Sequence, residues 1–174
     1  TTISNVLSGL GEVAIGLIGE GISAAQIPGI GWVGSIEYID QTDGYWLKLG
    51  GELNSWVQFT LEVEPPDQNL EYHLLDGYNL ISYIGTDGLS PGDALPDEVE
   101  PEITNFVGEG IACANLGFCD TDADNDGVPE CLWVGSIETL HQKKGYWVRT
   151  NIPVDFSWNN STFFIRNSND YFSY

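Results

Sequence analysis

Residues 32–37 read WVGSIE, and the same six letters return at residues 133–138, 101 positions further along a chain of 174 residues. At the same offset, GYWLK at residues 44–48 corresponds to GYWVR at residues 145–149. Matches of this length at a constant offset do not arise by chance, so the chain contains an internal repeat. The matched segments are rich in aromatic and β-branched residues, which favours strands.

Another pair of matched segments shows where the two copies differ. IGEGISAA at residues 18–25 corresponds to VGEGIACA at residues 107–114, at an offset of 89. The second copy therefore carries 12 additional residues, which lie between Asn115 and Trp133. We place the glycines of both GEG triplets in strands, where a glycine allows a bulge or a close backbone contact.

The similarity extends to the ends of the repeat. VQFT at residues 57–60 resembles VDFS at 154–157, and LISY at 80–83, which leads into the second copy, resembles YFSY at 171–174. We therefore expect the first module to lack its opening strand and the C-terminus to carry a spare one. In the simplest interpretation, the repeat arose by gene duplication and the two ends of the chain have no functional meaning. Alternatively, the spare strand fills the gap in its own chain or in the next chain, which makes a polymer.

The hydrophobic pattern has mostly a period of two, most clearly within residues 56–63. Turn signals such as Asp-Gly and Gly-Gly separate the short apolar runs. We predict an all-β protein of two small sandwich-like or barrel-like modules, residues 1–68 and 69–174. The second module contains the Cys- and Asp-rich insertion, residues 116–132.

Each module is also predicted to hold one short helix before its GEG segment. The two candidates, residues 5–13 and 90–99, occupy equivalent positions in the two copies. In the second candidate, Ser90 is the expected N-cap and Pro91 the first helical residue, because both residue types are favoured there.

The charge of the chain excludes several classes of protein. There are 26 Asp and Glu against 5 Lys and Arg, a formal net charge of −21, and residues 49–142 contain no Lys or Arg. Binding to nucleic acid or to an anionic membrane surface requires a basic surface, so we expect neither partner. No apolar run reaches the length of a transmembrane helix, so we expect no membrane insertion.

The composition favours an extracellular or cell-surface location. The chain has 21 Gly, no Met and three Cys within one short stretch, and no signal peptide precedes it. It therefore looks like a processed product or a piece of a longer protein. Two of the cysteines are expected to pair. Cys119 and Cys131 bracket an acidic loop, but Cys113 with either of them is also possible, and the third is then free and buried or bridges to another chain.

The insertion contains the most specific chemical signal. Its alternating Asp residues match the D-x-D-x-D-G core of calcium loops, in which hard oxygens bind the ion and the glycine allows a sharp turn. The twelfth position, where an EF-hand has a bidentate Glu, is Trp133, which excludes an EF-hand. The pattern resembles the shorter loops of thrombospondin type 3 repeats and predicts a structural calcium site, with a merely solvated acidic loop as the alternative. The candidate ligands are Asp120, Asp122, Asp124, Asp126, the carbonyl of Val128, and Glu130.

The sequence does not predict an enzyme. No nucleophile, base and orienting group can be named together, and the cysteine spacing does not suit zinc. Aromatic residues are the remaining candidates for ligand contacts, because exposed rings stack on sugars. Four Trp recur at equivalent positions and are expected in the core, namely Trp32, Trp46, Trp133 and Trp147. Trp56 and Trp158 are the better candidates for exposed stacking.

The motifs together resemble tandem-repeat β modules of secreted bacterial proteins. Those modules open with G-[WY]-N-L-I-S and close with a G-Y-W-[VIL]-[KR] strand, as residues 77–82, 44–48 and 145–149 do here. The resemblance implies a secreted, non-catalytic β module and says little about its task.

Our leading hypothesis from the sequence is an extracellular structural protein that assembles head-to-tail by sharing terminal strands, stabilised by calcium, with copies of itself as partners. The alternative is a calcium-stabilised module of a larger secreted protein that binds carbohydrates or a surface, with extracellular glycans as partners.

Overall fold

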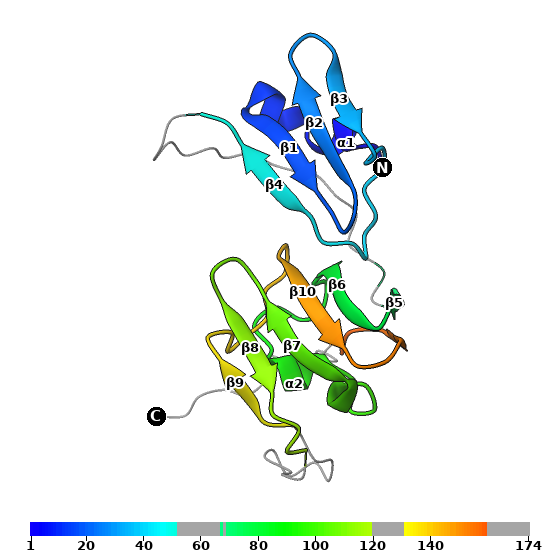
Figure 1. Ribbon diagram of the computed structural model, residues 1–174, viewed down its shortest axis with the longest axis vertical. Helices are drawn as coiled ribbons and strands as arrows, with labels where there is room; N and C mark the ends of the chain where they lie inside the picture. The colour runs from blue at the N-terminus through cyan, green and yellow to red at the C-terminus, as the bar shows by residue number, and fades with distance from the viewer. Residues whose placement is uncertain (52–66, 68, 120–130, 160–174) are drawn as a thin grey trace, which may run out of the picture.

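The computed structural model describes residues 1–51, 67, 69–119 and 131–159 and confirms the all-β fold class (Figure 1). The described strands form three sheets, accompanied by short helices. We call residues 1–51 the first unit and the described residues from 69 onward the second unit. The predicted module boundary at residue 68 lies outside the described residues.

The first unit is one antiparallel sheet backed by helical turns. Its elements are α1 (Ile3–Val6), the 3-10 helix η1 (Ser8–Val13), β1 (Ala14–Ile18), β2 (Ser23–Ile27), β3 (Gly31–Gly34) and β4 (Trp46–Leu49). The strand order is β3-β2-β1-β4. Leu7 and Leu10 from the helical turns pack with Leu17 and Ala24 of the sheet in one small aliphatic core. Burial of these apolar surfaces is the main stabilisation of the unit.

The second unit has the same arrangement with additional strands. Its elements are β5 (Tyr72–Leu74), β6 (Gly77–Ser82), α2 (Pro91–Ala94), η2 (Glu100–Glu102), β7 (Ile103–Val107), β8 (Ala112–Asn115), β9 (Trp133–Gly135), β10 (Gly145–Thr150) and β11 (Val154–Phe156). The main sheet has the order β6-β10-β7-β8-β9, and β11 pairs with β5 in a separate two-stranded sheet. One aromatic core joins the two sheets, since it contains side chains from both.

The two strand orders differ at one edge. From the far edge inward, the first unit has β3-β2-β1-β4 and the second has β9-β8-β7-β10, and only the second continues with β6. All pairings in both sheets are antiparallel. Within the ranges that the structure describes, no strand pairs with the outer edge of β4.

The predicted helices are present but shorter than expected. In α2 the Ser90 hydroxyl accepts a hydrogen bond from the backbone N–H of Asp93 at 3.2 Å and Pro91 is the first helical residue, which confirms the predicted cap. The first helix begins earlier than predicted, at Ile3, because the Thr2 hydroxyl caps it. The remainder, up to Val13, is 3-10 helix.

The placement of the GEG glycines in strands was wrong. Both triplets lie in the hairpin turns that follow β1 and β7. The last glycine of each triplet has a positive φ, +67° at Gly21 and +73° at Gly110, a conformation that glycine adopts without steric cost. The triplets therefore turn the chain rather than extend it.

The expectation of an exposed Trp158 was also wrong. Its side chain is 3% exposed and contacts the rings of Tyr72, Tyr83 and Phe156, with centroids 5.7, 4.9 and 4.9 Å away. Trp158 lies two residues after Phe156, so the period of two carries it into the same core. The other stacking candidate, Trp56, lies outside the described residues.

The four recurring Trp residues are half-buried rather than fully buried. Trp32 and Trp133 pack against the cores of their units. Trp46 and Trp147 occupy equivalent positions on β4 and β10, and neither joins the cores formed by the described residues. The prediction of core positions therefore holds in part for the first pair and not for the second.

Candidate functional site: the strand edge between the two units

The WVGS segments make the same contacts in both units. The Ser35 hydroxyl accepts a hydrogen bond from the backbone N–H of Ser23, and the Ser136 hydroxyl accepts one from Ala112, each at 3.0 Å. The glycine before each serine has no room for a side chain, because a Cβ would lie 2.2 Å from the carbonyl oxygen of Ser23 or Ala112. The motif therefore locks β3 onto β2 and β9 onto β8 in the same way.

The tyrosines of the two GYW segments are also equivalent. The Tyr45 hydroxyl accepts a hydrogen bond from the backbone N–H of Asp40, and the Tyr146 hydroxyl accepts one from His141, both at 3.1 Å. Burial raises the pKa of Tyr45 to about 12 and also raises the pKa of Tyr146. Since matched residues make matched contacts, the environment of one unit serves as a template for the other.

Strand β6 is held on both of its edges. On one edge it pairs with β10, where Leu80 lies opposite Trp147. On the other edge it meets the first unit. The backbone N–H of Gly44 donates to the Leu80 carbonyl, and that of Ser82 donates to the Thr42 carbonyl, both at 2.9 Å. β6 thus joins the two units through backbone hydrogen bonds.

Glu20, the middle residue of the first GEG triplet, completes this junction. Its Oε2 accepts a hydrogen bond from the backbone N–H of Leu80 at 2.8 Å. An edge N–H without a partner strand needs an acceptor, and a carboxylate is a strong one. This role could not be predicted from the sequence, since nothing in the triplet itself indicates a backbone partner 60 residues away.

The two units meet at equivalent residues. A Cβ on Gly145 would lie 3.3 Å from the Cα of Gly44, its counterpart in the first copy, and a Cβ on Gly44 would lie 2.7 Å from the Ile81 carbonyl oxygen. Contact between equivalent positions is typical of an approximate two-fold relation. Figure 1 is consistent with it, since β4 and β10 point in opposite directions away from this contact.

A groove lies where this relation would place a counterpart of β6. It has a volume of about 400 Å³ and is bounded on one side by β4 and on the other by the second unit. Its lining includes Trp46 and Leu47 on β4, and Glu109, Lys144 and Gly145 of the second unit. We call this cavity the β4 groove. Glu109 is the exposed counterpart of Glu20, so the groove repeats the surroundings of β6 without β6.

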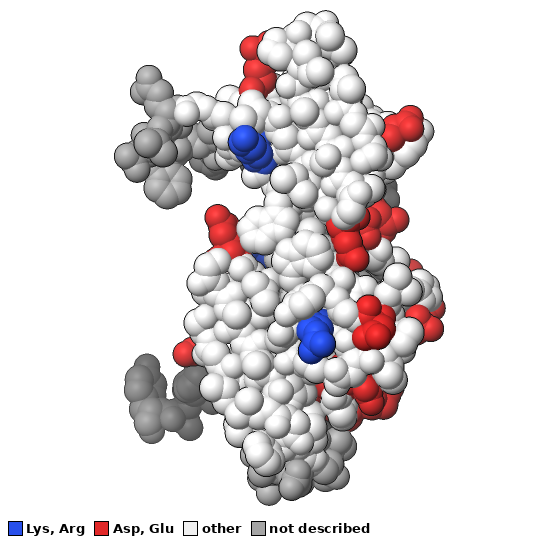
Figure 2. Space-filling view, viewed as in Figure 1, with Lys and Arg blue, Asp and Glu red and all other residues white. Residues whose placement is uncertain are grey.

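The few basic residues gather near this groove. Lys143 and Lys144 line it, and a third of the chain's five Lys and Arg, Lys48, is exposed on β4, the strand that borders it. Elsewhere acidic residues predominate, and Figure 2 shows acidic side chains on both units with few basic ones. A second acidic chain would therefore meet less repulsion at the groove than at other surfaces.

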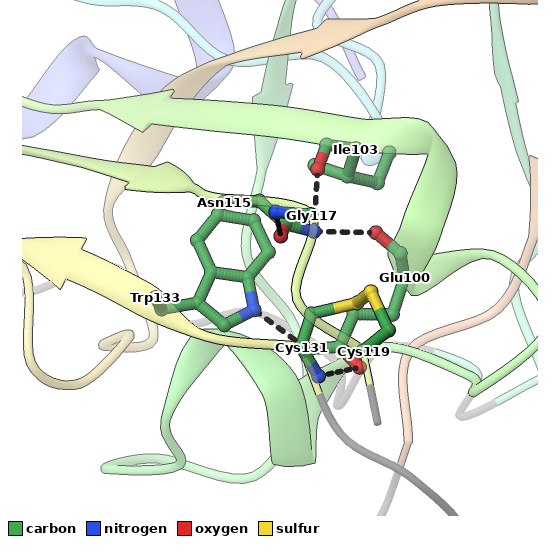
Figure 3. Close-up of a disulfide and its surroundings, with 7 residues drawn as sticks. All are labelled: Glu100, Ile103, Asn115, Gly117, Cys119, Cys131 and Trp133. Atoms are coloured by element: carbon green, nitrogen blue, oxygen red, sulfur yellow. Dashed lines mark hydrogen bonds between the residues drawn. A yellow bond between two sulfur atoms is a disulfide. The ribbon is translucent and has the colours of Figure 1, made fainter. Parts of the chain in front are cut away.

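The base of the acidic insertion is a defined structure (Figure 3). Cys119 and Cys131 form a disulfide that holds their Cα atoms 3.8 Å apart, which is one of the predicted pairings. The buried side chain of Glu100 accepts hydrogen bonds from the Trp133 indole at 2.6 Å and from the backbone N–H of Cys131 at 3.2 Å. Glu100 corresponds to Gly11 in the first copy, so this carboxylate accompanies the insertion and was missed from the sequence.

Asn115 fixes the other end of the insertion. Its side-chain amide donates to the carbonyls of Glu100 and Ile103, both at 3.1 Å, and its Oδ1 accepts from Gly117 at 2.8 Å (Figure 3). Both ends of the loop are therefore tied to η2 and the start of β7.

The predicted calcium ligands lie outside the described residues. These are Asp120, Asp122, Asp124, Asp126, Val128 and Glu130. Among the residues that are described, no group of His, Cys, Asp and Glu is arranged to hold a metal ion. The third cysteine, Cys113, is free and buried, and burial raises the pKa of its thiol to about 11, which disfavours the thiolate form.

No protein-family model, curated protein or solved structure matches this chain. None of the helices in the described part of the chain is long and apolar enough to span a membrane.

Proposed function

We propose that this protein is an extracellular structural protein that assembles head-to-tail with copies of itself, by adding a strand from one chain to the sheet of another. The observation that carries the proposal is the contrast between β10, which pairs with β6, and β4, which has no partner strand on its outer edge within the described residues. The product would be a filament or a surface layer.

The chemistry of a strand edge supports this function. An edge presents backbone N–H and C=O groups in a row, and strand addition satisfies them with main-chain hydrogen bonds. Residues 171–174 resemble residues 80–83, which contain the end of β6, so they provide a strand of suitable sequence. A donor at one end and an acceptor at the other form a heterologous contact, which extends into a filament unless the rotation closes a ring.

Calcium is proposed to stabilise the assembled protein. The Asp spacing in the insertion suits an oxygen-ligated ion. The disulfide and Glu100 tie down the loop base, which lowers the entropy lost when the loop binds an ion. The disulfide also supports the extracellular location, since disulfides persist in oxidising compartments.

The size of the native protein tests the proposal. We expect light scattering and negative-stain microscopy of the full chain to show elongated assemblies that contain many 19.1 kDa chains. Tyr171→Asp with Phe172→Asp should abolish the assemblies because the donor strand loses its apolar residues, whereas the matched control Ser161→Asp with Thr162→Asp should retain them. A monomer under all conditions, with and without calcium, would overturn the proposal and favour the surface- or carbohydrate-binding alternative.

A further inference from the structure

The segment that ends at Tyr83 and the segment that ends at Tyr174 match over a longer stretch than the last four residues. Residues 72–83 read YHLLDGYNLISY and residues 163–174 read FFIRNSNDYFSY, at an offset of 91. Both begin with an aromatic residue, have Leu or Ile at the third position, a polar or glycine-containing middle, and end in Ser-Tyr. The first of these segments contains β5 and β6, which lie in different sheets: β5 pairs with β11 and β6 pairs with β10.

We propose that the β4 groove binds residues 163–174 of a second copy of this chain, in the way that β10, Glu20 and Gly44 hold residues 72–83. This inference rests on the proposed function and gives it a specific site. Two of the contacts that hold β6 have direct counterparts at the β4 groove. The Glu109 carboxylate accepts the backbone N–H of Tyr171, as Glu20 does for Leu80, and the Gly145 N–H donates to the Tyr171 carbonyl, as Gly44 does for Leu80.

The pairing of β6 with β10 also predicts how the incoming strand aligns with β4. In the second unit Leu80 lies opposite Trp147 and Tyr78 lies opposite Arg149. The corresponding pairs are Tyr171 with Trp46, and Asn169 with Lys48. The bond from Ser82 to the Thr42 carbonyl is not carried over, because Lys143, the counterpart of Thr42, has a different backbone conformation with φ +65°.

The occupant comes from a second copy rather than from the same chain. Asn159, the last described residue, is bound to α2 and its C-terminal neighbour through three hydrogen bonds, to the carbonyls of Asp93, Ala94 and Leu95. Figure 1 places α2 within the second unit, away from β4. Residues 163–174 therefore leave the second unit beside α2, and we take their acceptor to be the β4 groove of the next chain, as the proposed head-to-tail assembly requires.

Disulfide trapping in the full chain tests the register and the occupant together. The variant Lys48→Cys with Asn169→Cys places two cysteines directly opposite each other. The matched control Lys48→Cys with Asp170→Cys shifts one cysteine by a single residue, which turns its side chain to the other face of the strand. After oxidation of a mixture of ¹⁴N and ¹⁵N chains, we expect mixed-isotope 48–169 cross-links by mass spectrometry, at least tenfold more abundant than in the control.

The other outcomes separate this inference from the proposed function. Assemblies that persist without a 48–169 cross-link would show that residues 163–174 do not bind in the β4 groove. The proposed function would then require strand sharing at another site. A 48–169 cross-link confined to single-isotope peptides in monomers would show that the chain fills its own groove, which contradicts binding of a second copy. Monomers without any cross-link would overturn both.

Glu109 provides an independent readout of the same site. We expect Glu109→Gln to raise the concentration needed for assembly by about 3- to 10-fold, since a charge-assisted hydrogen bond becomes a neutral one. Glu138→Gln changes another exposed carboxylate of the second unit and should leave this concentration unchanged. An equal effect of the two substitutions would overturn the contact between Glu109 and the incoming strand.

Discussion

The first and second units share four strands in the same order and differ in what lies beside the fourth. β10 pairs with β6, and β6 also reaches the first unit through Gly44, Thr42 and Glu20. β4 instead borders a groove. The two cores differ as well, since that of the first unit is small and largely aliphatic and that of the second contains a cluster of aromatic rings. Matched motifs therefore make matched local contacts in the two units, whereas the additional strand and the larger core distinguish the second unit.

The largest effect is expected from the aromatic core of the second unit. Trp158→Ala should lower the free energy of unfolding by about 3–5 kcal/mol, because it removes a fully buried ring and leaves a cavity. Trp46→Ala, at a half-buried position of the first unit, should cost much less. Denaturant titration followed by circular dichroism measures both, and equal costs would contradict the burial of Trp158 in the core of the second unit.

The second-largest effect on the free energy of unfolding is expected at Glu100, which holds the base of the insertion. Glu100→Ala leaves the Trp133 indole N–H and the Cys131 backbone N–H without their acceptor, at an expected cost of about 3 kcal/mol in unfolding free energy. Glu98→Ala removes an exposed carboxylate nearby and serves as the control. A similar loss of stability in both variants, measured by thermal unfolding, would show that Glu100 does not anchor the loop.

Calcium removal should affect the second unit alone, because only the second copy has the insertion. At a calcium concentration 100-fold above its dissociation constant, binding to the folded protein should contribute about 2.7 kcal/mol. We expect a chelator to lower the melting temperature of the native chain. The variant Asp122→Asn with Asp124→Asn should be insensitive to the chelator. A native chain whose melting temperature does not respond to calcium would contradict the site.

The junction glycines should have a smaller and unequal effect. Gly44→Ala places a Cβ 2.7 Å from the Ile81 carbonyl oxygen and should cost about 1–2 kcal/mol of unfolding free energy, since the strand must move. Gly16→Ala, on β1, meets only ordinary contacts at 3.6 Å and should cost less. Hydrogen exchange at Leu80 and Ser82 would reveal whether the junction opens, and unchanged exchange in Gly44→Ala would argue against its role.

The smallest effect is expected for the dependence of the melting temperature on pH. The hydrogen bond between His73 and Asp155, opposite residues of β5 and β11, raises the pKa of His73 above its usual 6.5. This contribution to stability is complete below pH 6.5 and is lost as the pH rises through the raised pKa. Because His73 is exposed, we expect a small fall in melting temperature between pH 5 and pH 9. His73→Gln should remove it, whereas His141→Gln should not.

The sequence predicted the features that depend on neighbouring residues. The short β-strands, the Ser90 cap and the option of a Cys119–Cys131 pair follow from local patterns. The burial of Trp158 was missed because only the Trp residues that recur at equivalent positions were assigned to the core, although the spacing of Trp158 from Phe156 indicated the core. The roles of Glu20 and Glu100 depend on contacts 60 and 31–33 residues away, which no local pattern contains.

The way β6 is shared between the units has a mechanical consequence. A bend at the junction would separate β6 from Thr42–Gly44 and from Glu20 or strip it from β10, so bending requires several backbone hydrogen bonds to break together. Bonds that must break together resist deformation more than bonds that break in turn. If the contacts proposed for Glu109, Gly145 and β4 form between chains, each joint along the fibre also needs several bonds to break together, and the fibre resists bending along its whole length.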